Sequence, residues 1–499
     1  MMIDTILGFD VGTTSVKAGL FTVEDGRLLG IARAAYPTSR PRDGWVEQDP
    51  RDWTRAMAEC WVDLARRVGA VRLRSIGICS QVNTHVLVDD SLSPLRPAIV
   101  WQDVRTEAVA AELDAQVAAA ERTRLWGGPF TIDASFSLSR LEWLRRHERD
   151  TVEAARWLLQ PKEYCVAAIC GAVVTDTLSP IGLVGQDGAY VRGVTDLVEG
   201  SARLLPELRW FDELAGTTRA GNPVGLPEGV PVAVGTMDAW ANVYGSGVTQ
   251  PSQAIEVAGT SEIVGVLSDQ AVPTPGVITF PTVRDRYLHA GPTQAGGDAL
   301  AWAARCFGTS IEGILAEAAR GLSDPQPIVF LPHLAGERAP LWNPEARGLF
   351  LGLSTSTELR HLALAVLEGV AFSARQLLEA CEEAAGGPAT DIRLSGGGAR
   401  SADWNRIKAS AHGRPLNLLA VLESGVLGAA LMGAVAADLE ANLEEAALRR
   451  VALAGQIEPE LAESARLEHL YGVYRETYAT LAGLFPKLAP TSSRGPAVG

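Results

Sequence analysis

Apolar and polar positions along the first half of the chain alternate between helical windows and short β-type runs. Residues 52–67 and 106–120 carry apolar side chains at helical spacing, whereas residues 75–78 form a short apolar run that is typical of a strand. Alternating strands and helices favour an α/β architecture. A chain of 499 residues is long enough for about two to four domains, so the pattern predicts α/β lobes rather than one large core.

The turn between two β-type runs, residues 3–7 and 15–21, consists of small, acidic and hydroxyl residues. These are Asp10, Val11, Gly12, Thr13 and Thr14. Because β-type residues flank the glycine on both sides, the segment predicts a strand, a tight turn and a second strand. A P-loop or a Rossmann fingerprint is different, since its glycines lead into a helix. Residues 12–14 are called the first turn below.

A similar turn occurs about half a chain later, at Gly259, Thr260 and Ser261, with β-type residues on both sides. This second turn alone would be a weak signal, but two related hairpins at half-length spacing predict two lobes of similar design. A loop rich in proline and glycine at residues 221–227 and the segment after it place the division near residue 246. The predicted lobes are residues 1–245 and 246–485.

Two further windows belong to the second half of the chain. Residues 426–437 are apolar and rich in Gly and Ala, which predicts a buried helix that is too short to span a bilayer. Residues 459–485 carry Leu and Tyr at helical spacing, which predicts a stripe packed in the core. The tail, residues 486–499, is rich in Pro, Ser and Gly and is expected to be disordered.

Composition narrows the class of partner. With 47% hydrophobic and 21% charged residues, the chain has the balance of a soluble globular protein. Its net charge of -15 argues against nucleic acid or an anionic membrane as a partner, because both need a cationic surface. An anionic nucleotide is still compatible, since backbone amides and a metal ion can bind phosphate inside an acidic protein.

The sequence contains no clear motif for export or for binding a transition metal. The N-terminal apolar run has no basic segment before it and ends at Asp10, so it does not resemble a signal peptide, and a cytoplasmic location is expected. The six cysteines include no Cys-x-x-Cys pair and the seven histidines are scattered. Structural disulfides and a zinc site are therefore not expected.

Two acidic residues stand where strands end. Asp10, beside the amide-rich first turn, would suit Mg²⁺ bound through water, with Thr13 and Thr14 facing phosphates; the alternative is that it only caps the turn. The second hairpin has Val257 at this position, so one lobe alone would supply the carboxylate. Asp238 could accept the proton of a sugar hydroxyl, or it could simply be the N-cap of a helix.

Three other segments combine residue types that bind ligands. Residues 396–398 are three glycines before a helix start, which lets backbone approach a nucleotide closely; a plain flexible loop is the alternative. Residues 80–85 and 99–106 mix amides, charges and an indole, as sugar sites do. In the last of these, Asp103 and Arg105 could instead pair with each other, and His85 is expected to be structural.

Taken together, these segments resemble the FGGY family of carbohydrate kinases, most closely its xylulokinase branch. The match spans nearly the whole chain and is most specific at Phe-Leu-Pro-His-Leu-Ala-Gly-Glu-Arg-Ala-Pro, residues 330–340, followed by residues 346–348 and 367–372. The resemblance implies an α/β fold of two actin-like (ribonuclease-H-like) ATPase lobes, with the active site in the cleft between them. It also implies ATP and Mg²⁺ as cofactors, a small sugar as substrate, no nucleic-acid or membrane partner, and a homodimer.

Position by position, the resemblance makes Asp238 the catalytic base and Asp10 the residue on the metal side. The implied ATP-binding residues are Gly12, Thr13, Thr14, Lys17, Gly259, Thr260, Ser261, Gly396, Gly397, Gly398, Ala399 and Asn405. The implied substrate-binding residues are Gln81, Val82, Asn83, Trp101, Asp103 and Asp238.

The chain departs from the family pattern at residues that are expected to contact the sugar. Where xylulokinases read Gln-Met-His-Gly, it reads Gln-Val-Asn-Thr at residues 81–84, and the base is followed by Ala239 instead of Asn or Gln. Glycerol kinases carry Arg-Glu where this chain has Val82 and Asn83, which makes glycerol unfavourable. D-xylulose is the expected substrate; ribulose, ribitol, erythritol or gluconate are alternatives. An actin- or chaperone-like ATPase is the alternative from another class, although such proteins lack an acid paired with a Trp-x-Asp segment.

Overall fold

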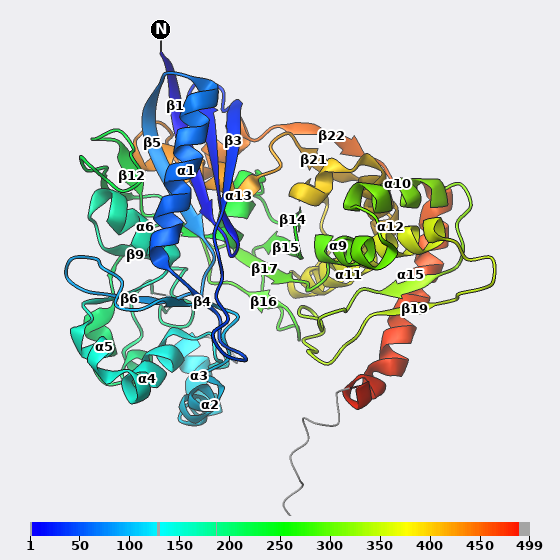
Figure 1. Ribbon diagram of the computed structural model, residues 1–499, viewed down its shortest axis with the longest axis horizontal. Helices are drawn as coiled ribbons and strands as arrows, with labels where there is room; N and C mark the ends of the chain where they lie inside the picture. The colour runs from blue at the N-terminus through cyan, green and yellow to red at the C-terminus, as the bar shows by residue number, and fades with distance from the viewer. Residues whose placement is uncertain (1, 127–129, 186, 489–499) are drawn as a thin grey trace, which may run out of the picture. The chain divides into compact units, whose positions relative to one another are not determined.

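Figure 1 shows the computed structural model, which describes residues 2–126, 130–185 and 187–488. The chain forms two compact units. The first unit consists of Met1–Gly247 and Ser424–Val451, and the second of Val248–Glu423 and Ala452–Gly499. The expected division at residue 246 is close to the first junction. Residues 424–451, which were expected in the second lobe, pack in the first unit instead.

A seven-stranded sheet is the centre of the first unit, in the order β11-β12-β5-β1-β2-β3, with β13 also paired to β5. Strands β5, β12 and β13 run parallel to one another beside β1, whereas β2 and β3 form an antiparallel meander with it. The strands are β1 (Ile3–Val11), β2 (Ser15–Thr22), β3 (Leu28–Ala35), β5 (Val71–Ser80), β11 (Leu214–Thr217), β12 (Pro231–Ala233) and β13 (Thr236–Met237). The predicted first hairpin is confirmed as β1 and β2, and the strand predicted at residues 75–78 as part of β5.

The two faces of this sheet are covered by helices of different character. The helix α1 (Pro50–Val68), predicted at residues 52–67, lies against one face of the sheet (Figure 1). Its Trp53 and Met57 share one core with Leu7 and Phe9 of β1. Since successive side chains of a strand point to opposite faces, Gly8 faces the other way. The other face is occupied by α13 (Ser424–Ala436), which confirms the buried helix predicted at residues 426–437.

Glycines let helix α13 pack closely on the first sheet and on α8. This close packing explains why α13 belongs to the first unit although the residues before it belong to the second. A Cβ atom at Gly8 would lie 2.0 Å from the carbonyl oxygen of Val426, and one at Gly77 would lie 1.7 Å from that of Ala429. On the helix itself, a Cβ at Gly428 would lie 1.9 Å from the carbonyl oxygen of Ala241 in α8 (Asp238–Gly245). Only hydrogen fits at these positions, so backbone packs directly on backbone.

The first unit has a second apolar core, around Leu113, Phe136 and Leu141. The helix predicted at residues 106–120 is two helices, because the chain turns at residues 116–118. Further elements of the first unit are β4 (Glu47–Gln48), β6 (Val86–Val88), β7 (Ala98–Ile99), α2 (Glu107–Ala115), α3 (Ala119–Trp126), α4 (Ser137–His147), α5 (Arg149–Ala154), β8 (Trp157–Leu159), α6 (Pro161–Cys170), β9 (Val174–Asp176), α7 (Arg192–Thr195), η1 (Ser201–Leu204) and β10 (Glu207–Arg209). Helix α14 (Leu443–Arg450) follows α13.

The second unit repeats the design of the first. Its sheet has the order β16-β17-β15-β14-β20-β21-β22, with β14, β15 and β17 antiparallel and β20 and β21 parallel beside β14. This is the arrangement of β1, β2 and β3 with β5 and β12, so the two-lobe repeat predicted from the turns is confirmed. The strands are β14 (Gln253–Ala258), β15 (Glu262–Ser268), β16 (Ile278–Thr279), β17 (Tyr287–Pro292), β18 (Val329–Leu331), β19 (Leu349–Leu351), β20 (Asp391–Ser395), β21 (Leu416–Leu419) and β22 (Leu453–Ile457).

Helices cover this second sheet. They are α9 (Gly297–Phe307), α10 (Ile311–Gly321), α11 (Leu359–Ala384), η2 (Gly397–Arg400), α12 (Ala402–His412), α15 (Leu461–Leu481) and η3 (Ala482–Leu488). In α15, the side chains of Leu467, Leu470, Tyr471 and Tyr474 are buried, so the predicted core stripe is confirmed. Of the tail expected to be disordered, residues 486–488 belong to η3, and residues 489–499 lie outside the described part.

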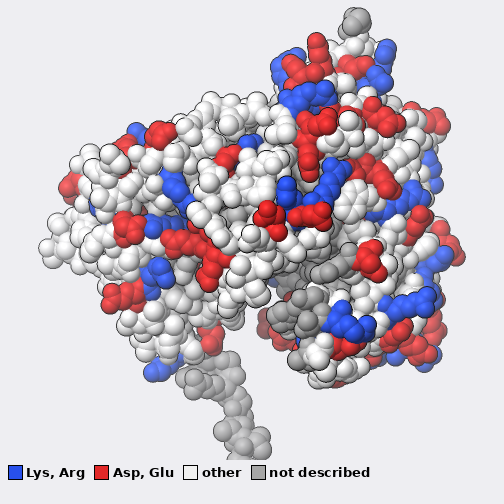
Figure 2. All heavy atoms as spheres, turned by 180° about the vertical axis from the view of Figure 1, so that it is seen from behind, with Lys and Arg blue, Asp and Glu red and all other residues white. Residues whose placement is uncertain are grey.

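The surface agrees with an acidic protein of mixed charge. On the face drawn in Figure 2, acidic and basic side chains of the described residues are interspersed rather than separated by sign. None of the helices in the described ranges is long and apolar enough to cross a membrane.

Substituting Gly77 by Ala tests the backbone packing of α13. The added Cβ would meet the carbonyl of Ala429 at 1.7 Å, so we expect a loss of about 3 kcal/mol, the upper end for overpacking, or roughly 6–12 °C in Tm. Gly387→Ala is the control, because a Cβ there meets nothing within 4 Å, and its unfolding free energy should stay within about 0.5 kcal/mol of wild type. Thermal unfolding by calorimetry measures both, and equal Tm values in the two variants would refute the packing account.

Candidate active site

The parallel strands of the first unit bring two carboxylates to one edge of the sheet. Cys79 of β5 pairs with Asp10 of β1 on one side and with Thr236 of β13 on the other. Because the carboxyl ends of parallel strands meet at the same edge, Asp10 and Asp238, the first residue of α8, lie together there. The structure thus combines the two acids that the sequence singled out separately.

The pKa values of Asp10 and Asp238 are both raised, but neighbouring charges act on them in different ways. Burial raises the pKa of Asp10, and the positive charge of Lys17, whose Nζ lies 3.8 Å from Asp10 Oδ2, offsets part of the effect. Burial also raises the pKa of Asp238 to about 7, and the negative charge of Asp10 adds to the rise. A carboxyl group with a pKa near neutral pH can accept a proton and release it again, which is the property of a general base.

The first turn is held by three side chains. The hydroxyl of Tyr36 donates to the carbonyl of Gly12, and Gln48 Nε2 donates to the carbonyl of Thr13 at 2.7 Å. The indole Nε1 of Trp101 donates to Thr13 Oγ1 at 3.1 Å. The last contact connects the expected phosphate turn to an expected sugar residue, so the structure brings these two groups of predictions together.

The segment at residues 81–83 combines an unpaired acceptor with a strained backbone. Gln81 Nε2 donates to Gln48 Oε1 at 3.2 Å, whereas Gln81 Oε1 is buried without a hydrogen-bond partner. Asn83 has a φ of 56°, a conformation that Asn tolerates better than most residues. Its amide donates to Gln160 Oε1 at 2.7 Å and its Nδ2 to Ser135 Oγ at 3.1 Å, while Val82 between them is half-buried.

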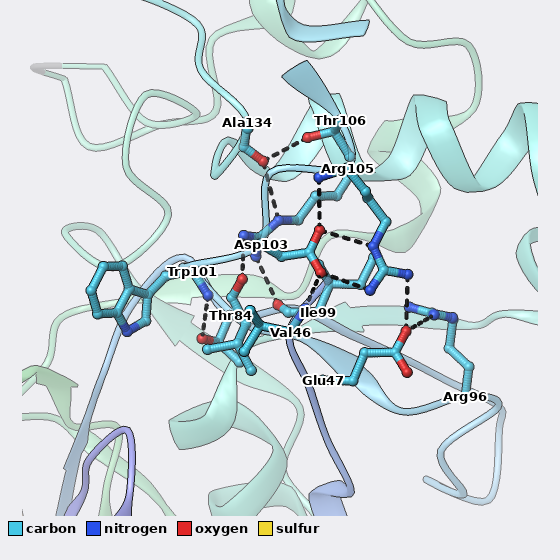
Figure 3. Close-up of polar contacts among 12 residues, drawn as sticks. Val46, Glu47, Thr84, Arg96, Ile99, Trp101, Asp103, Arg105, Thr106 and Ala134 are labelled. Atoms are coloured by element: carbon cyan, nitrogen blue, oxygen red, sulfur yellow. Dashed lines mark hydrogen bonds and ion pairs between the residues drawn. The ribbon is translucent and has the colours of Figure 1, made fainter. Parts of the chain in front are cut away.

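Asp103 has its own partners inside the protein (Figure 3). Its Oδ2 accepts from the amide of Val46 at 2.5 Å and from Arg105 Nη2 at 2.7 Å, and its Oδ1 accepts from Arg105 Nε at 2.9 Å. Arg105 also lies 2.9 Å from Glu47, which lies 2.7 Å from Arg96. Only 1% of the surface of Asp103 is exposed, so Asp103 pairs with Arg105 inside the protein, as the sequence allowed. The indole of Trp101 points away from this network (Figure 3).

A buried guanidinium joins the segments that carry the sugar candidates. Arg140 of α4 has no exposed surface. It donates to the backbone carbonyls of Asn83, of Ile99 at 2.8 Å and of Val100 at 2.7 Å. The neighbouring His85 is buried and in contact with Arg140 at 3.0 Å, and burial lowers its pKa, which agrees with a structural role. Removing Arg140 would leave the carbonyl of Asn83 without its donor. The carbonyls of Ile99 and Val100 would keep one donor each, the amides of His85 and Asp103.

In the second unit, the second turn and the glycine loop at residues 396–399 are packed against each other. Gly396 has a φ of 86°, and a Cβ there would lie 2.4 Å from the carbonyl oxygen of Ala258, next to the turn. A Cβ at Gly398 would lie 2.9 Å from the Cβ of Ala258. Asn405 of α12 donates from Nδ2 to the carbonyl of Ala399 at 2.8 Å, and its Oδ1 is buried without a partner.

Helix α9 completes this second site. The amide of Gly297, its first residue, donates to the carbonyl of Gly259 at 2.9 Å, and the amide of Asp298 donates to that of Thr260 at 3.0 Å. A Cβ at Gly296 would lie 2.6 Å from the carbonyl oxygen of Thr260. The second turn is therefore fixed by backbone contacts to the start of α9, and Ala258, just before the turn, packs against residues 396–398.

Sequence reasoning missed several residues that shape both sites. Gln48, Arg140 and Gly297 act through the backbone of distant segments, and no local pattern announces such partners. Cys79 lies beside both carboxylates, and burial, Asp10 and Asp238 raise the pKa of its thiol, so it stays uncharged. The strand-end position of Cys79 is the one signal that could have indicated it.

Comparisons with known proteins agree with this arrangement. Residues 5–245 match the N-terminal domain of the FGGY family of carbohydrate kinases, and residues 254–437 match its C-terminal domain. The chain is 28% identical to the xylulose kinase of Escherichia coli strain K12 over 97% of this chain and 99% of that one, and 27% identical to the gluconokinase of Bacillus subtilis strain 168 over 87% of each. The crystal structure of a xyloylose kinase from Brucella ovis superimposes with a TM-score of 0.83 at 30% identity, covering 96% of this chain and 100% of that one. The predicted α/β class with two actin-like ATPase lobes is confirmed.

The raised pKa of Asp238 predicts a specific pH dependence of stability. A carboxyl whose pKa is about 7 in the folded protein and about 3.9 when unfolded holds its proton more tightly when folded, so stability is lost as the pH rises towards 7. Asp238→Asn removes this titration. Urea unfolding should show the stability of wild type, relative to the variant, falling by about 2 kcal/mol between about pH 5 and pH 7.5. Parallel pH curves for the two proteins would contradict the raised pKa.

Proposed function

The chain belongs to the FGGY family of carbohydrate kinases, and we propose that it transfers the terminal phosphate of ATP to a hydroxyl of a neutral ketopentose, D-xylulose in the first place. The observation that supports this most is the placement of Asp238, with its raised pKa, beside Asp10 at the sheet edge. Trp101, bound to the first turn, adds an aromatic surface to the same unit.

In the proposed reaction, Asp238 accepts the proton of the sugar hydroxyl as that oxygen forms its bond to the terminal phosphorus. The bond from this phosphorus to the bridging oxygen breaks, and ADP leaves with the electron pair. Ala239, which follows the base, offers no side-chain hydrogen bond. Of Asp238 and Ala239, only Asp238 can therefore take part in accepting the proton.

Magnesium fits the oxygen atoms at this edge. Asp10 and the hydroxyls of Thr13 and Thr14 are the hard, oxygen-only donors that Mg²⁺ prefers, and Mg²⁺ commonly uses one or two carboxylates together with substrate phosphates. Within the described residues, no three His, Cys, Asp or Glu side chains gather into a ready-made metal cluster, which is compatible with such a shared site. When bound, the metal would neutralise charge on the phosphates.

For ATP, we propose two groups of residues. In the first unit, residues 12–14 and Lys17 face phosphate. The amides involved are those of Thr13 and Thr14, because the amide of Gly12 donates to the carbonyl of Ser15 at 3.1 Å. In the second unit, the phosphate contacts come from the second turn, residues 259–261, and the adenosine contacts from the glycine loop, residues 396–399. Asn405, which binds the carbonyl of Ala399 in this loop, belongs to the same proposed adenosine site, and its Oδ1 has no hydrogen-bond partner among the described residues.

The proposed sugar contacts favour an uncharged substrate. They are Gln81, Val82, Asn83, Trp101 and Asp238, and none of them is cationic. Two arginines that contact these segments are already occupied, since Arg105 binds Asp103 and Arg140 binds backbone carbonyls. Neither of these two arginines is therefore free to bind the carboxylate of a sugar acid such as gluconate. Asp103 then acts on the sugar indirectly, by holding the loop that carries Trp101.

A coupled assay that reports ADP formation tests the substrate. We expect turnover with D-xylulose to exceed that with gluconate by at least about tenfold, because a carboxylate without a cationic partner is costly to desolvate. Ribulose, ribitol, erythritol and glycerol complete the panel. Gluconate as the best substrate would overturn the substrate proposal but keep the kinase. ATP hydrolysis that is equal with and without any sugar would favour a non-kinase ATPase instead.

Replacing the proposed base tests the chemistry. Asp238→Ala should reduce kcat by about 10² to 10⁴, the usual effect of removing a positioned base, while ADP binding measured by calorimetry stays close to wild type. Asp196→Asn, an exposed carboxylate of the same unit, serves as the control and should keep normal kcat. Near-normal turnover of Asp238→Ala would remove Asp238 from the mechanism.

A further inference from the structure

Three charged side chains and a histidine of the second unit meet where solvent does not reach. Lys408 Nζ lies 2.6 Å from Glu256 Oε1 and 2.6 Å from both carboxylate oxygens of Glu262. His412 Nε2 lies 2.8 Å from the other oxygen of Glu256. The side chains of all four are at most 1% exposed. None of the roles proposed above uses this cluster.

The ionisation of the cluster follows from these contacts. Burial alone would lower the pKa of Lys408, but the charges of Glu256 and Glu262 outweigh it and raise the pKa, so the side chain is an ammonium. Burial raises the pKa of Glu262 to about 7 despite the attraction of Lys408. Burying charges in this way is a poor source of stability, because desolvation costs as much as the attraction returns.

The cluster is placed at the base of the second turn. Glu262 is the first residue of β15, directly after the turn, and it pairs across the hairpin with Ala258. Glu256 lies on the opposite strand, β14, and pairs with Val264. One ammonium therefore binds a carboxylate on each strand of the hairpin, just below the residues proposed to contact phosphate.

The same ammonium belongs to the helix proposed to bind adenosine. Lys408 follows Asn405 by three positions on α12, and residues three apart are neighbours on a helix surface. Asn405 in turn binds the glycine loop through the carbonyl of Ala399. Lys408 Nζ also lies 5.1 Å from the ring centroid of Trp404, which fixes the side chain from another direction.

We propose that Lys408 is a positioning residue for nucleotide: through Glu256 and Glu262 it fixes the distance between the second turn and the helix that carries Asn405. The inference rests on the proposed binding of ATP by this unit. It assigns Lys408 no contact with ATP. A shift of the turn relative to Asn405 would weaken contacts to phosphate or adenosine without touching the sugar residues.

The test separates position from stability. In Glu256→Met/Glu262→Leu/Lys408→Met, apolar residues of similar volume replace the three charged groups, an exchange that is often neutral or stabilising for buried ion pairs. We expect the triple variant to remain folded, with a Tm close to or somewhat below wild type because His412 loses its partner Glu256. The KM for ATP and the Kd for ADP should rise by at least about tenfold. The KM for the sugar should change by less than about twofold.

A conservative pair provides the rescue. Glu262→Gln keeps an oxygen acceptor for Lys408 and should keep the KM for ATP within about threefold of wild type, whereas Glu262→Leu should raise it about tenfold. This comparison decides the question if the triple variant does not fold. The matched control is Glu368→Gln/Arg466→Met, which removes another buried carboxylate and its partner from the same unit and should leave the KM for ATP unchanged.

The outcomes distinguish this inference from the proposed function. A triple variant with wild-type KM for ATP, or equal effects of Glu262→Gln and Glu262→Leu, would overturn the role of Lys408 and leave nucleotide binding intact. Gly396→Val adds a side chain whose Cβ would lie 2.4 Å from the carbonyl oxygen of Ala258. If this variant bound ADP normally, the proposed nucleotide site itself would be wrong.

Discussion

The backbone contact between α13 and the first sheet is the constraint on which the proposed catalytic edge depends. At Gly8 and Gly77 the sheet has room for nothing larger than hydrogen, and at Gly428 the helix meets α8 in the same way. Such contacts leave little freedom to slide, because any shift drives carbonyl oxygens into backbone. Helix α13 therefore holds β1, β5 and α8 as one rigid group.

The position of Asp238 follows from this group. Ser424, the first residue of α13, donates to Asn242 Oδ1 at 2.7 Å, and Asn242 Nδ2 donates to the carbonyl of Asp238 at 2.8 Å. Asp10 is near the end of β1, which the same helix covers. The packing of α13 therefore keeps Asp10 close enough to Asp238 to raise its pKa. Residues as far apart in the sequence as Asp10 and Gly428 must be folded before Asp238 has its final pKa.

Much of this was predictable from local sequence, and the limits have a physical origin. The two turns, α1, α13 and the stripe of α15 follow from short-range periodicity and turn chemistry, and each was predicted. The return of α13 to the first unit was not, because a glycine at position 8 or 77 permits close approach but does not name the segment that approaches. The same holds within the site: the pairing of Asp103 with Arg105 is local and was foreseen as an alternative, whereas Arg140 and Gln48 bind carbonyls that carry no residue-specific signal.

Each unit contains a buried cation that fixes segments of its candidate site. In the first, Arg140 binds backbone carbonyls at two strand ends; in the second, Lys408 binds two carboxylates below the second turn. A surface ion pair could not serve in the same way, because it is worth only about 0–1 kcal/mol and is screened by salt. A buried cation restricts the positions of its partners much more strongly. If a partner moves away, a desolvated charge or carbonyl loses a hydrogen bond. Turns rich in glycine and threonine have little side-chain packing of their own, so their geometry must come from the partners around them. Tyr36, Gln48 and Trp101 hold the first turn, and the backbone at the start of α9 holds the second, above the carboxylates that Lys408 binds.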